Sequence, residues 1–263
     1  MRLGSPINAV HRQLVRRLHR RIAPLTGWGP IVSFTFDDFP RSAALTGGTI
    51  LERYGARGTY YTAIDLMNCS GEAGELFHAS DLEELLEKGH ELASHTFSHI
   101  SARAVPRDRF LADANRGRQA LEKFSGSECG NFAYPFGEVA LPVKAALGPQ
   151  MTSARGIIPG INGPDEVDLN LLLANSLYGD VAHSGHAEAL IKDNMRRKGW
   201  LIFYTHDVQM QPSPYGCTPE LFEAVASFAA ESGCQILTVR QTLELIGVSK
   251  GQPARQAVRS VPA

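Results

Sequence analysis

The 263-residue chain has little net charge, few cysteines and no long apolar run, and each absence excludes a class of protein. Its formal net charge of -1 gives no overall field that would gather nucleic acid, which we exclude as a partner. No window approaches the roughly 18 consecutive apolar residues of a transmembrane helix, so we predict no membrane span. The four cysteines are widely spaced, which predicts reduced thiols rather than a disulfide-rich secreted domain.

The first 30 residues form a basic segment with a helical pattern. Its first 22 residues hold six arginines but lack the continuous apolar stretch of a secretory signal, so we predict a cytoplasmic protein. Apolar residues recur at every fourth position and would form one stripe on a helix: Val10, Leu14, Leu18 and Ile22. Two interpretations stay open, namely a helix packed on the outside of the domain and a helix lying on an anionic membrane surface.

From residue 31 onward, short apolar runs alternate with segments of helical period, as expected of βα units around a parallel sheet. Strands are predicted at 31–36, 59–63, 91–94, 131–134, 200–205 and 235–239, and two more near Met151 and Leu172. No linker divides residues 31–247, which we interpret as a single α/β domain. Residues 248–263 have no apolar period and are predicted to be a flexible tail.

Helix boundaries are marked by capping residues. Ser80 and Glu83 predict a capping box, and Thr218 followed by Pro219 predicts another helix start. Further helices are expected to begin near Pro106 and Ser184.

Ionisable residues follow three of the predicted strands, at the point where each strand ends. Because the carboxyl ends of parallel strands meet at one rim, these side chains are expected to lie together. They are Asp37 and Asp38 after the strand at 31–36, His95 and His99 after 91–94, and His206 and Asp207 after 200–205.

Two imidazoles and one carboxylate form the ligand set of a catalytic zinc with an open position. Such an ion lowers the pKa of its bound water toward 7, and hydrolysis then needs a base and an acid as well. Since adjacent side chains of a strand point to opposite sides, one aspartate can bind the metal while the other stays free as a base. A facial triad that binds Fe(II) for an oxygenase is an alternative from the same residue types.

These segments resemble the motifs of the polysaccharide deacetylase family of the NodB-homology type (carbohydrate esterase family 4), over residues 31 to 247. The TFDD segment at 35–38 resembles the first motif, which implies that Asp37 is the general base and Asp38 a metal ligand. The HTFSH segment at 95–99 resembles the second motif, which implies that His95 and His99 bind the metal. The resemblance implies a distorted (β/α) barrel of about seven strands and one divalent metal ion, for which zinc is the first candidate and cobalt, nickel and manganese are alternatives.

Two further segments complete the resemblance. The YPFG segment at 134–137 is similar to the third motif, which implies that Tyr134, Pro135 and Phe136 lie at the oxyanion and substrate site and that the Phe136 N–H holds the oxyanion. The FYTHD segment at 203–207 resembles the final motif, which implies that His206 is the general acid. The implied activity is the removal of N-acetyl groups from amino sugars.

The sequence departs from the family pattern at three places. Phe39 follows the paired aspartates where the family has glycine, and we predict that its ring enters the substrate cleft. Ala133 replaces an arginine that pairs with the base, a role for which Arg155 is the candidate. The fourth motif, an aspartate that orients the acid, has no clear match, and its candidates are Asp165, Asp168 and Asp180.

We therefore predict a metal-dependent deacetylase acting on an N-acetylated amino sugar of a polysaccharide, an oligosaccharide or a lipid-linked glycan. A pseudoenzyme that only binds sugar is the alternative, motivated by Ala133 and the missing fourth motif. Aromatic residues near the predicted rim could stack on sugar rings or cap the core: Phe39, Phe97, Phe136 and Tyr215. His183 and His186 lie in a Gly/Ser region and are predicted to be surface residues.

Overall fold

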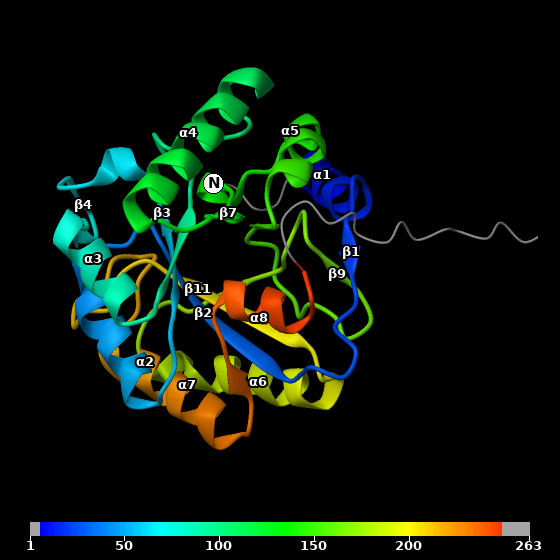
Figure 1. Ribbon diagram of the computed structural model, residues 1–263. Helices are drawn as coiled ribbons and strands as arrows, with labels where there is room; N and C mark the ends of the chain where they lie inside the picture. Colours follow the sequence, from blue (N-terminus) through cyan, green and yellow to red (C-terminus); the bar gives the residue numbers. More distant parts are fainter. Residues whose placement is uncertain (1–5, 249–263) are drawn as a thin grey trace, which may run out of the picture.

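Seven parallel strands curl into a half-barrel, and helices cover its outside (Figure 1). This computed structural model describes residues 6–248, so residues 249–263 of the predicted tail lie outside the described residues. In sheet order the strands are β10 (Asn175–Ser176), β11 (Trp200–Thr205), β2 (Ile31–Asp37), β3 (Thr59–Thr62), β6 (Glu91–Ser94), β7 (Asn131–Ala133) and β8 (Ser153–Arg155), and β12 (Gln235–Ile236) also pairs with β2. The predicted α/β class and the distorted barrel of about seven strands are confirmed.

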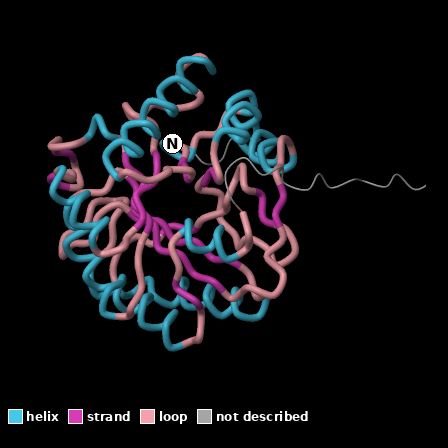
Figure 2. Tube along the Cα trace, in the orientation of Figure 1, coloured by secondary structure: helices cyan, strands magenta, loops and turns pink. Residues whose placement is uncertain are grey.

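Every pairing in this sheet is parallel, so all the strands end at the same rim. Figure 2 shows the strands grouped inside a surrounding layer of helices. The helices are α2 (Thr49–Arg53), α3 (Ala79–Glu87), α4 (Arg107–Ser125), α5 (Leu141–Leu147), α6 (Ser184–Arg197), α7 (Pro219–Glu231) and α8 (Val239–Leu245). Two small antiparallel pairs lie outside the sheet, β1 (Ile22–Ala23) with β9 (Val167–Asp168) and β4 (Ser70–Gly71) with β5 (Gly74–Glu75).

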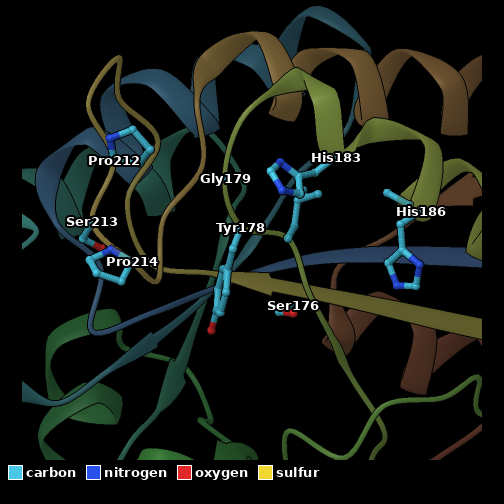
Figure 3. A pocket seen from close by; sticks show the side chains of 10 residues that line it. Ser176, Tyr178, Gly179, His183, His186, Pro212, Ser213 and Pro214 are labelled. Atoms are coloured by element: carbon cyan, nitrogen blue, oxygen red, sulfur yellow. The ribbon is translucent and has the colours of Figure 1, made fainter.

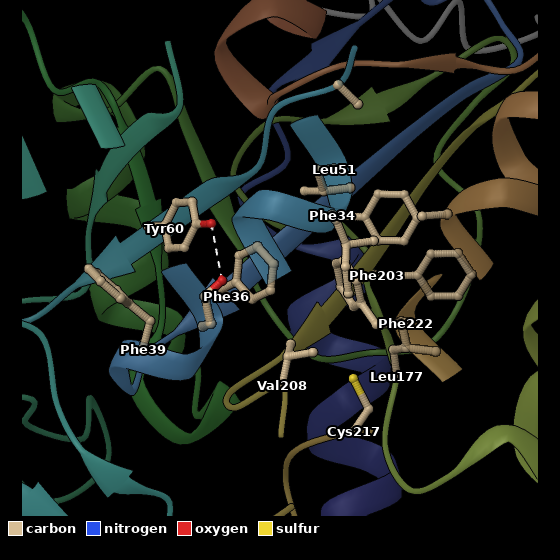
Figure 4. Close-up of a cluster of buried hydrophobic side chains, with 14 of the residues drawn as sticks. Phe34, Phe36, Phe39, Leu51, Tyr60, Leu177, Phe203, Val208, Cys217 and Phe222 are labelled. Atoms are coloured by element: carbon tan, nitrogen blue, oxygen red, sulfur yellow. Dashed lines mark hydrogen bonds between the residues drawn. The ribbon is translucent and has the colours of Figure 1, made fainter. Parts of the chain in front are cut away.

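Aromatic side chains pack between the sheet and its outer helices (Figure 4). The Phe36 ring stacks on Tyr60 with centroids 4.6 Å apart, and Phe222 of α7 packs against Phe34 at 5.3 Å. Alternate residues of a strand face opposite sides, so Phe34 and Phe36 point outward to the helices while Thr35 and Asp37 face the barrel interior. This alternation fixes which residues of β2 can reach the active rim.

Two local predictions were shifted by tertiary contacts. The capping box of α3 is formed by His78 and Asp81 instead of Ser80 and Glu83, and Arg41 holds the Asp81 carboxylate at 2.8 Å. The strand predicted at 235–239 ends at Ile236, because Thr238 caps α8 and its hydroxyl accepts from the Gln241 N–H. The helix start at Thr218 agrees with the prediction, since its hydroxyl accepts from the Leu221 N–H.

The N-terminal helix α1 (Pro6–Arg17) packs on the domain, but not through the predicted apolar stripe. Its buried contact is Val15, which is 2% exposed, whereas Val10, Leu14 and Leu18 are 60%, 42% and 43% exposed. The buried ammonium of Lys144 in α5 donates to the carbonyls of Val15 and Leu18 at 2.7 and 2.9 Å, which satisfies the open end of the helix. Among residues 6–248, no helix has the length and apolarity needed to cross a membrane.

Candidate active site and metal centre

Asp38, His95 and His99 meet at the carboxyl rim of the sheet, and one ligand atom from each lies within 4.8 Å of the others. The Asp38 Oδ1 atom is 3.1 Å from His99 Nε2 and 3.6 Å from His95 Nε2. Asp38 follows β2 and the histidines follow β6, so two strand ends separated only by β3 supply the whole ligand set. These three residues are the predicted metal ligands, and the fold brings them together.

The hydrogen bonds of this cluster fit a cation. His95 Nδ1 lies 2.8 Å from the Ala133 carbonyl oxygen, so Nδ1 carries the proton and the lone pair of Nε2 faces the Asp38 carboxylate. Asp38 Oδ1 is itself buried and has no hydrogen-bond partner. A buried carboxylate oxygen facing an imidazole lone pair is unfavourable unless a positive ion lies between them. The residues present therefore suit a divalent metal.

The pKa values of the cluster have the same physical origin. Burial, followed by the nearby charge of Asp37, raises the pKa of Asp38 to about 8. Burial also lowers the pKa of His95 to about 3 and that of His99 to about 4. Both imidazoles are thus neutral at pH 7, which is the state that binds metals.

The backbone of the site is strained. Four site residues adopt the left-handed region of φ, which non-glycine residues seldom do. Their φ values are 53° for Asp38, 64° for Thr96, 50° for His99 and 59° for Phe136. They are four of the seven such residues in the described part of the chain. Each conformation costs about 1–3 kcal/mol and persists only where the surrounding structure imposes it, which is typical of functional sites.

Asp37 is the second buried carboxylate of the site and is paired with Arg155. Arg155 Nη2 donates to Asp37 Oδ1 at 2.5 Å, and the guanidinium lies 4.8 Å from the Tyr61 ring centroid and 5.2 Å from that of Tyr204. Burial alone would raise the pKa of Asp37, but the charge of Arg155 and its hydrogen bond hold it below the ordinary value. Asp37 is thus a carboxylate at neutral pH, beside the metal ligands.

The YPFG segment contributes one exposed residue. Phe136 is 56% exposed, and its ring centroid lies 4.5 Å from that of His99. Tyr134 and Pro135 are buried, with the Tyr134 ring packed edge-on against Phe132 at 5.3 Å. The prediction that Tyr134 and Pro135 line the substrate site is wrong for their side chains, because both serve the core and shape the turn that presents Phe136.

Phe39 does not enter a cleft. It is 0% exposed, its ring stacks on Phe77 at 4.7 Å, and it meets Tyr60 edge-on at 5.0 Å. The prediction for Phe39 is therefore wrong: the chain turns inward after Asp38, and the ring completes the outer aromatic core. Phe97 is also covered, with the Arg116 guanidinium 3.5 Å from its ring centroid, whereas Tyr215 is 55% exposed.

His206 follows β11, whose last residue Thr205 pairs with Phe36 of β2, so His206 lies at the same rim as Asp37 and Asp38. Its Nδ1 donates to the Tyr215 carbonyl oxygen at 3.3 Å, which leaves Nε2 available to a substrate. The buried Asp207 carboxylate shapes the loop that carries Tyr215, because it accepts from the Ser213 N–H at 2.8 Å and the Ser213 hydroxyl at 2.6 Å. Gly216 is needed there, since a Cβ would lie 2.1 Å from Asp207 Oδ1.

Residues 26–148 match the family model for polysaccharide deacetylase, and this range contains the metal ligands, Asp37 and the Phe136 turn. Over these residues the chain is similar to the polysaccharide deacetylase family. The match supports polysaccharide deacetylation as its general activity. A search of curated proteins finds no match.

Solved structures with the same fold include several deacetylases and esterases. A family 4 acetyl xylan esterase from Clostridium thermocellum, in complex with a cobalt ion, has a TM-score of 0.57 at 20% identity, covering 84% of this chain and 93% of that one. The CE4 domain of a xylanase from the hindgut metagenome of Trinervitermes trinervoides gives 0.58 at 17% identity, covering 86% and 95%. The peptidoglycan deacetylase PdaC of Bacillus subtilis gives 0.50 at 16% identity, covering 84% and 92%. These similarities show the fold.

The structure explains how this chain departs from the motifs of the polysaccharide deacetylase family. Arg155 of β8 reaches Asp37, so the guanidinium missing at position 133 comes from the neighbouring strand. None of the proposed aspartates contacts His206: Asp168 accepts from Lys144 at 2.8 Å, and Asp180 caps the turn before α6. Asp165 has no contact with His206 either, among the described residues. The group that His206 Nδ1 contacts is instead the backbone carbonyl of Tyr215.

Tyr178 is a site residue that the sequence did not reveal. Its ring lies 6.4 Å from the ring of His206 and 6.1 Å from that of Tyr215, and its hydroxyl donates to Tyr204. Tyr178 lies in a stretch broken by glycine and proline, where neither strand nor helix period could be recognised. The only signal was its position two residues after the short strand β10.

Proposed function

We propose that this chain is a metal-dependent hydrolase that removes N-acetyl groups from an amino sugar of a glycan. The observation that carries the proposal is the grouping of Asp38, His95 and His99 next to a separate buried carboxylate, Asp37, with His206 across the rim. This arrangement supplies a cation site, a base and an acid within one strand-end cluster, as amide hydrolysis requires.

Asp37 is the proposed base. Its hydrogen bond from Arg155 fixes the carboxylate, and the two tyrosine rings on either side of the guanidinium limit the movement of the pair. Because Arg155 keeps Asp37 ionised, the carboxylate can accept a proton from an attacking water molecule.

Asp38, His95 and His99 would hold the divalent ion, which when bound polarises the acetamido carbonyl and lowers the pKa of water. The Phe136 N–H, presented by a strained turn, donates to the oxyanion that develops on the carbonyl oxygen. His206 gives the proton from Nε2 to the departing amine, while the Tyr215 carbonyl fixes the ring through Nδ1.

Zinc is the proposed metal. Two neutral imidazoles and one carboxylate are the ligands of many catalytic zinc sites, and cobalt, nickel and manganese are the alternatives. The cobalt ion named for the acetyl xylan esterase of the same fold supports a site that accepts several divalent metals. The parallel α/β sheet disfavours the alternative of an Fe(II) oxygenase, since that ligand set is more usual on an all-β scaffold.

The test is metal content measured together with acetate release. We expect the purified chain to bind one divalent ion and to release acetate from N-acetylated oligosaccharides, and a chelator to remove both properties. The His99→Ala variant should bind less metal, and acetylated xylan in the same panel distinguishes ester from amide substrates. A pseudoenzyme would bind metal and saccharide but release no acetate, which would contradict the proposal. Arg155 already supplies the guanidinium whose absence motivated that alternative.

We also propose that an exposed apolar stripe, made of Val10 and Leu14 in α1 and Leu18 directly after it, contacts an anionic membrane surface. The stripe is 42–60% exposed, and Arg17 lies next to it on the helix. Residues 10–22 contain five arginines and no acidic residue, so the surface complements anionic lipid in charge as well as in polarity. The cytoplasmic location stays a prediction.

Vesicle sedimentation tests this contact. We expect the chain to sediment with phosphatidylglycerol vesicles and not with phosphatidylcholine vesicles, and the Leu14→Gln/Leu18→Gln variant to lose this binding. Leu45 is 50% exposed elsewhere on the molecule, so Leu45→Gln is the matched control. If the Leu14→Gln/Leu18→Gln variant binds vesicles as the wild type does, but has a lower molar mass than the wild type in the absence of vesicles, the stripe binds a second copy of the chain instead.

A further inference from the structure

The turn that presents Phe136 is contacted by α1, a helix that takes no part in the proposed reaction. His11 Nε2 lies 2.7 Å from the carbonyl oxygen of Val139, three residues after Phe136. Because a carbonyl only accepts, the Nε2–H group of His11 donates this hydrogen bond, which sets the tautomer of the ring. The helix ends at Arg17, before the family match begins at residue 26, so the contact comes from outside the matched segment.

A buried apolar contact accompanies the hydrogen bond. Val15 follows His11 by four residues and therefore lies on the same face of α1. Val15 is 2% exposed and belongs to one buried apolar cluster together with Tyr134 and Val139. Tyr134 precedes the Phe136 turn and Val139 follows it, so α1 packs against the cluster that contains both ends of the turn.

The helix is held to the barrel by charged groups. The buried ammonium of Lys144 in α5 donates to the carbonyl oxygens of Val15 and Leu18, and also to the Asp168 carboxylate at 2.8 Å. Further along the chain, Arg21 donates to two backbone carbonyls just before β8, at 2.7 and 2.5 Å. Figure 1 shows α1 beside α5. Because its carboxyl end is fixed in this way, the helix offers His11 as a rigid support for the turn.

The turn needs a support, because Phe136 has a strained φ of 59°. Relaxation of this residue to a negative φ would rotate its N–H group away from its present direction. Two backbone hydrogen bonds close the turn itself, with the N–H groups of Gly137 and Glu138 as donors at 2.9 and 3.1 Å. These bonds join neighbouring residues of the turn, whereas His11 ties the exit of the turn to another element.

The loop after His206 is fixed differently. Ser213 of this loop lies in one wall of a cavity of about 630 Å³ that Tyr178 also lines (Figure 3). The Asp207 carboxylate accepts from the Ser213 N–H at 2.8 Å and from its hydroxyl at 2.6 Å. This loop therefore has an anchor in its own sequence, whereas the turn at 135–137 has one in α1.

We propose that His11 is a positioning residue for the oxyanion donor: through the Val139 carbonyl it holds the turn in which the Phe136 N–H points to the substrate. This role rests on the proposed function, because the Phe136 N–H stabilises a developing charge only in that reaction. An oxyanion donor acts in the transition state, so its displacement lowers kcat and leaves KM almost unchanged. Removal of a whole donor costs about 10²- to 10³-fold in kcat, and the loss of its support should cost about tenfold.

The test compares three variants of α1 with the wild type, with an N-acetylglucosamine oligomer as substrate. His11→Ala removes the donor, and we expect kcat to fall about tenfold while KM stays within about twofold of the wild-type value. His11→Gln places an amide N–H at a similar distance and should restore kcat to within about twofold of the wild type. Gln13 is exposed on the same helix, so Gln13→Ala is the matched control and should keep the wild-type values. An unchanged kcat in His11→Ala would overturn the role of His11, as would a loss that His11→Gln does not restore.

Amide hydrogen exchange tests the position of the turn without any substrate. If His11 holds the turn, the N–H groups of Gly137 and Glu138 should exchange about tenfold faster in His11→Ala than in the wild type and in Gln13→Ala. Equal exchange in all three proteins would overturn the proposal, even if kcat falls.

Failure of this role and failure of the proposed function give different results. If acetate is released and His11→Ala is as fast as the wild type, only the positioning role is wrong. If no substrate releases acetate, the proposed function is wrong, and hydrogen exchange then decides whether His11 holds the turn.

Discussion

The two ends of the barrel each hold a buried polar cluster, and the clusters differ in how their hydrogen bonds are satisfied. At the amino end, Glu91 Oε1 accepts from Asn131 at 2.6 Å, and Oε2 accepts from Thr59 at 2.9 Å and from the Arg240 N–H at 2.8 Å. At the carboxyl end, Asp38 Oδ1 has no donor, and the backbone around it is strained. Glu91 begins β6 and Asp38 follows β2, so the two carboxylates lie at opposite ends of the same sheet, on strands separated only by β3.

This difference separates a structural cluster from a functional one. Glu91 is 3% exposed, yet its surroundings complete every interaction without an external group. The Asp38 cluster leaves Oδ1 without a hydrogen-bond donor, and it opens toward exposed residues such as Phe136. An incomplete buried cluster costs stability, so its presence at a rim indicates that function maintains it. Substitutions at the two ends should accordingly affect different properties.

The largest expected effect is at the carboxyl end. Asp37→Asn keeps the size of the side chain but cannot accept the proton, so kcat should fall on the order of 10³-fold. Metal content should stay at the wild-type level, because Asp38, His95 and His99 are unchanged. Acetate release and metal analysis on the same preparation measure both. A variant that keeps wild-type turnover would show that Asp37 is not the base.

At the amino end the expected effect is on stability. Glu91→Ala leaves three donors unsatisfied and opens a cavity, which should lower the free energy of unfolding by about 3 kcal/mol. Because the rim is distant, kcat per folded molecule should be unchanged. Chemical denaturation and active-site titration measure the two quantities, and Glu91→Gln, which retains most of the contacts, is the milder control. A fall in kcat would show that Glu91 also affects catalysis, which would contradict the separate roles of the two ends.

A smaller effect is expected for Arg155→Lys. The ammonium keeps a positive charge near Asp37, but it lacks the planar group that lies between Tyr61 and Tyr204. We expect kcat to fall about 10- to 100-fold, because the base is less precisely held. Initial rates at saturating oligosaccharide test this, with circular dichroism to confirm folding. An Arg155→Lys enzyme as fast as wild type would mean that charge alone suffices.

The smallest effect concerns His90 at the amino end. Burial lowers the pKa of His90, whose Nδ1 accepts from the Gly58 N–H at 3.0 Å. A folded-state pKa below the unfolded value gives stability that is present above pH 6.5 and is lost as the pH falls through the folded-state value. The free energy of unfolding of the wild type should therefore decline more steeply below pH 6.5 than that of His90→Asn. Parallel pH profiles would contradict this assignment.

Much of the fold followed from local patterns. The strands at 91–94 and 200–205 have the predicted bounds, since polar residues follow each of them, and Pro219 after Thr218 marked the start of α7. The α8 helix was missed because its seven residues are too few to establish a period. The stripe of α1 pointed to a buried face, but the partner surface on α5 takes Val15 instead.

The site could be predicted where its residues are adjacent in sequence to strand ends. The three proposed metal ligands, Asp37 and His206 are of this kind, and the fold brings them to one rim. Phe39 and Tyr134 were misassigned because a motif gives the position of a residue in the chain, not the side of the sheet to which its ring turns. Tyr178 was missed because its segment has no period.

The amino-acid sequence by itself determined the parallel α/β architecture and the rim to which the acidic and imidazole side chains belong, because both depend on local periodicity and on where strands end. The tertiary structure alone decided which guanidinium meets Asp37, which carbonyl holds His206 and which rings are buried. These are contacts between segments far apart in the chain, and they depend on the curl of the sheet and on packing volume, which no local pattern encodes.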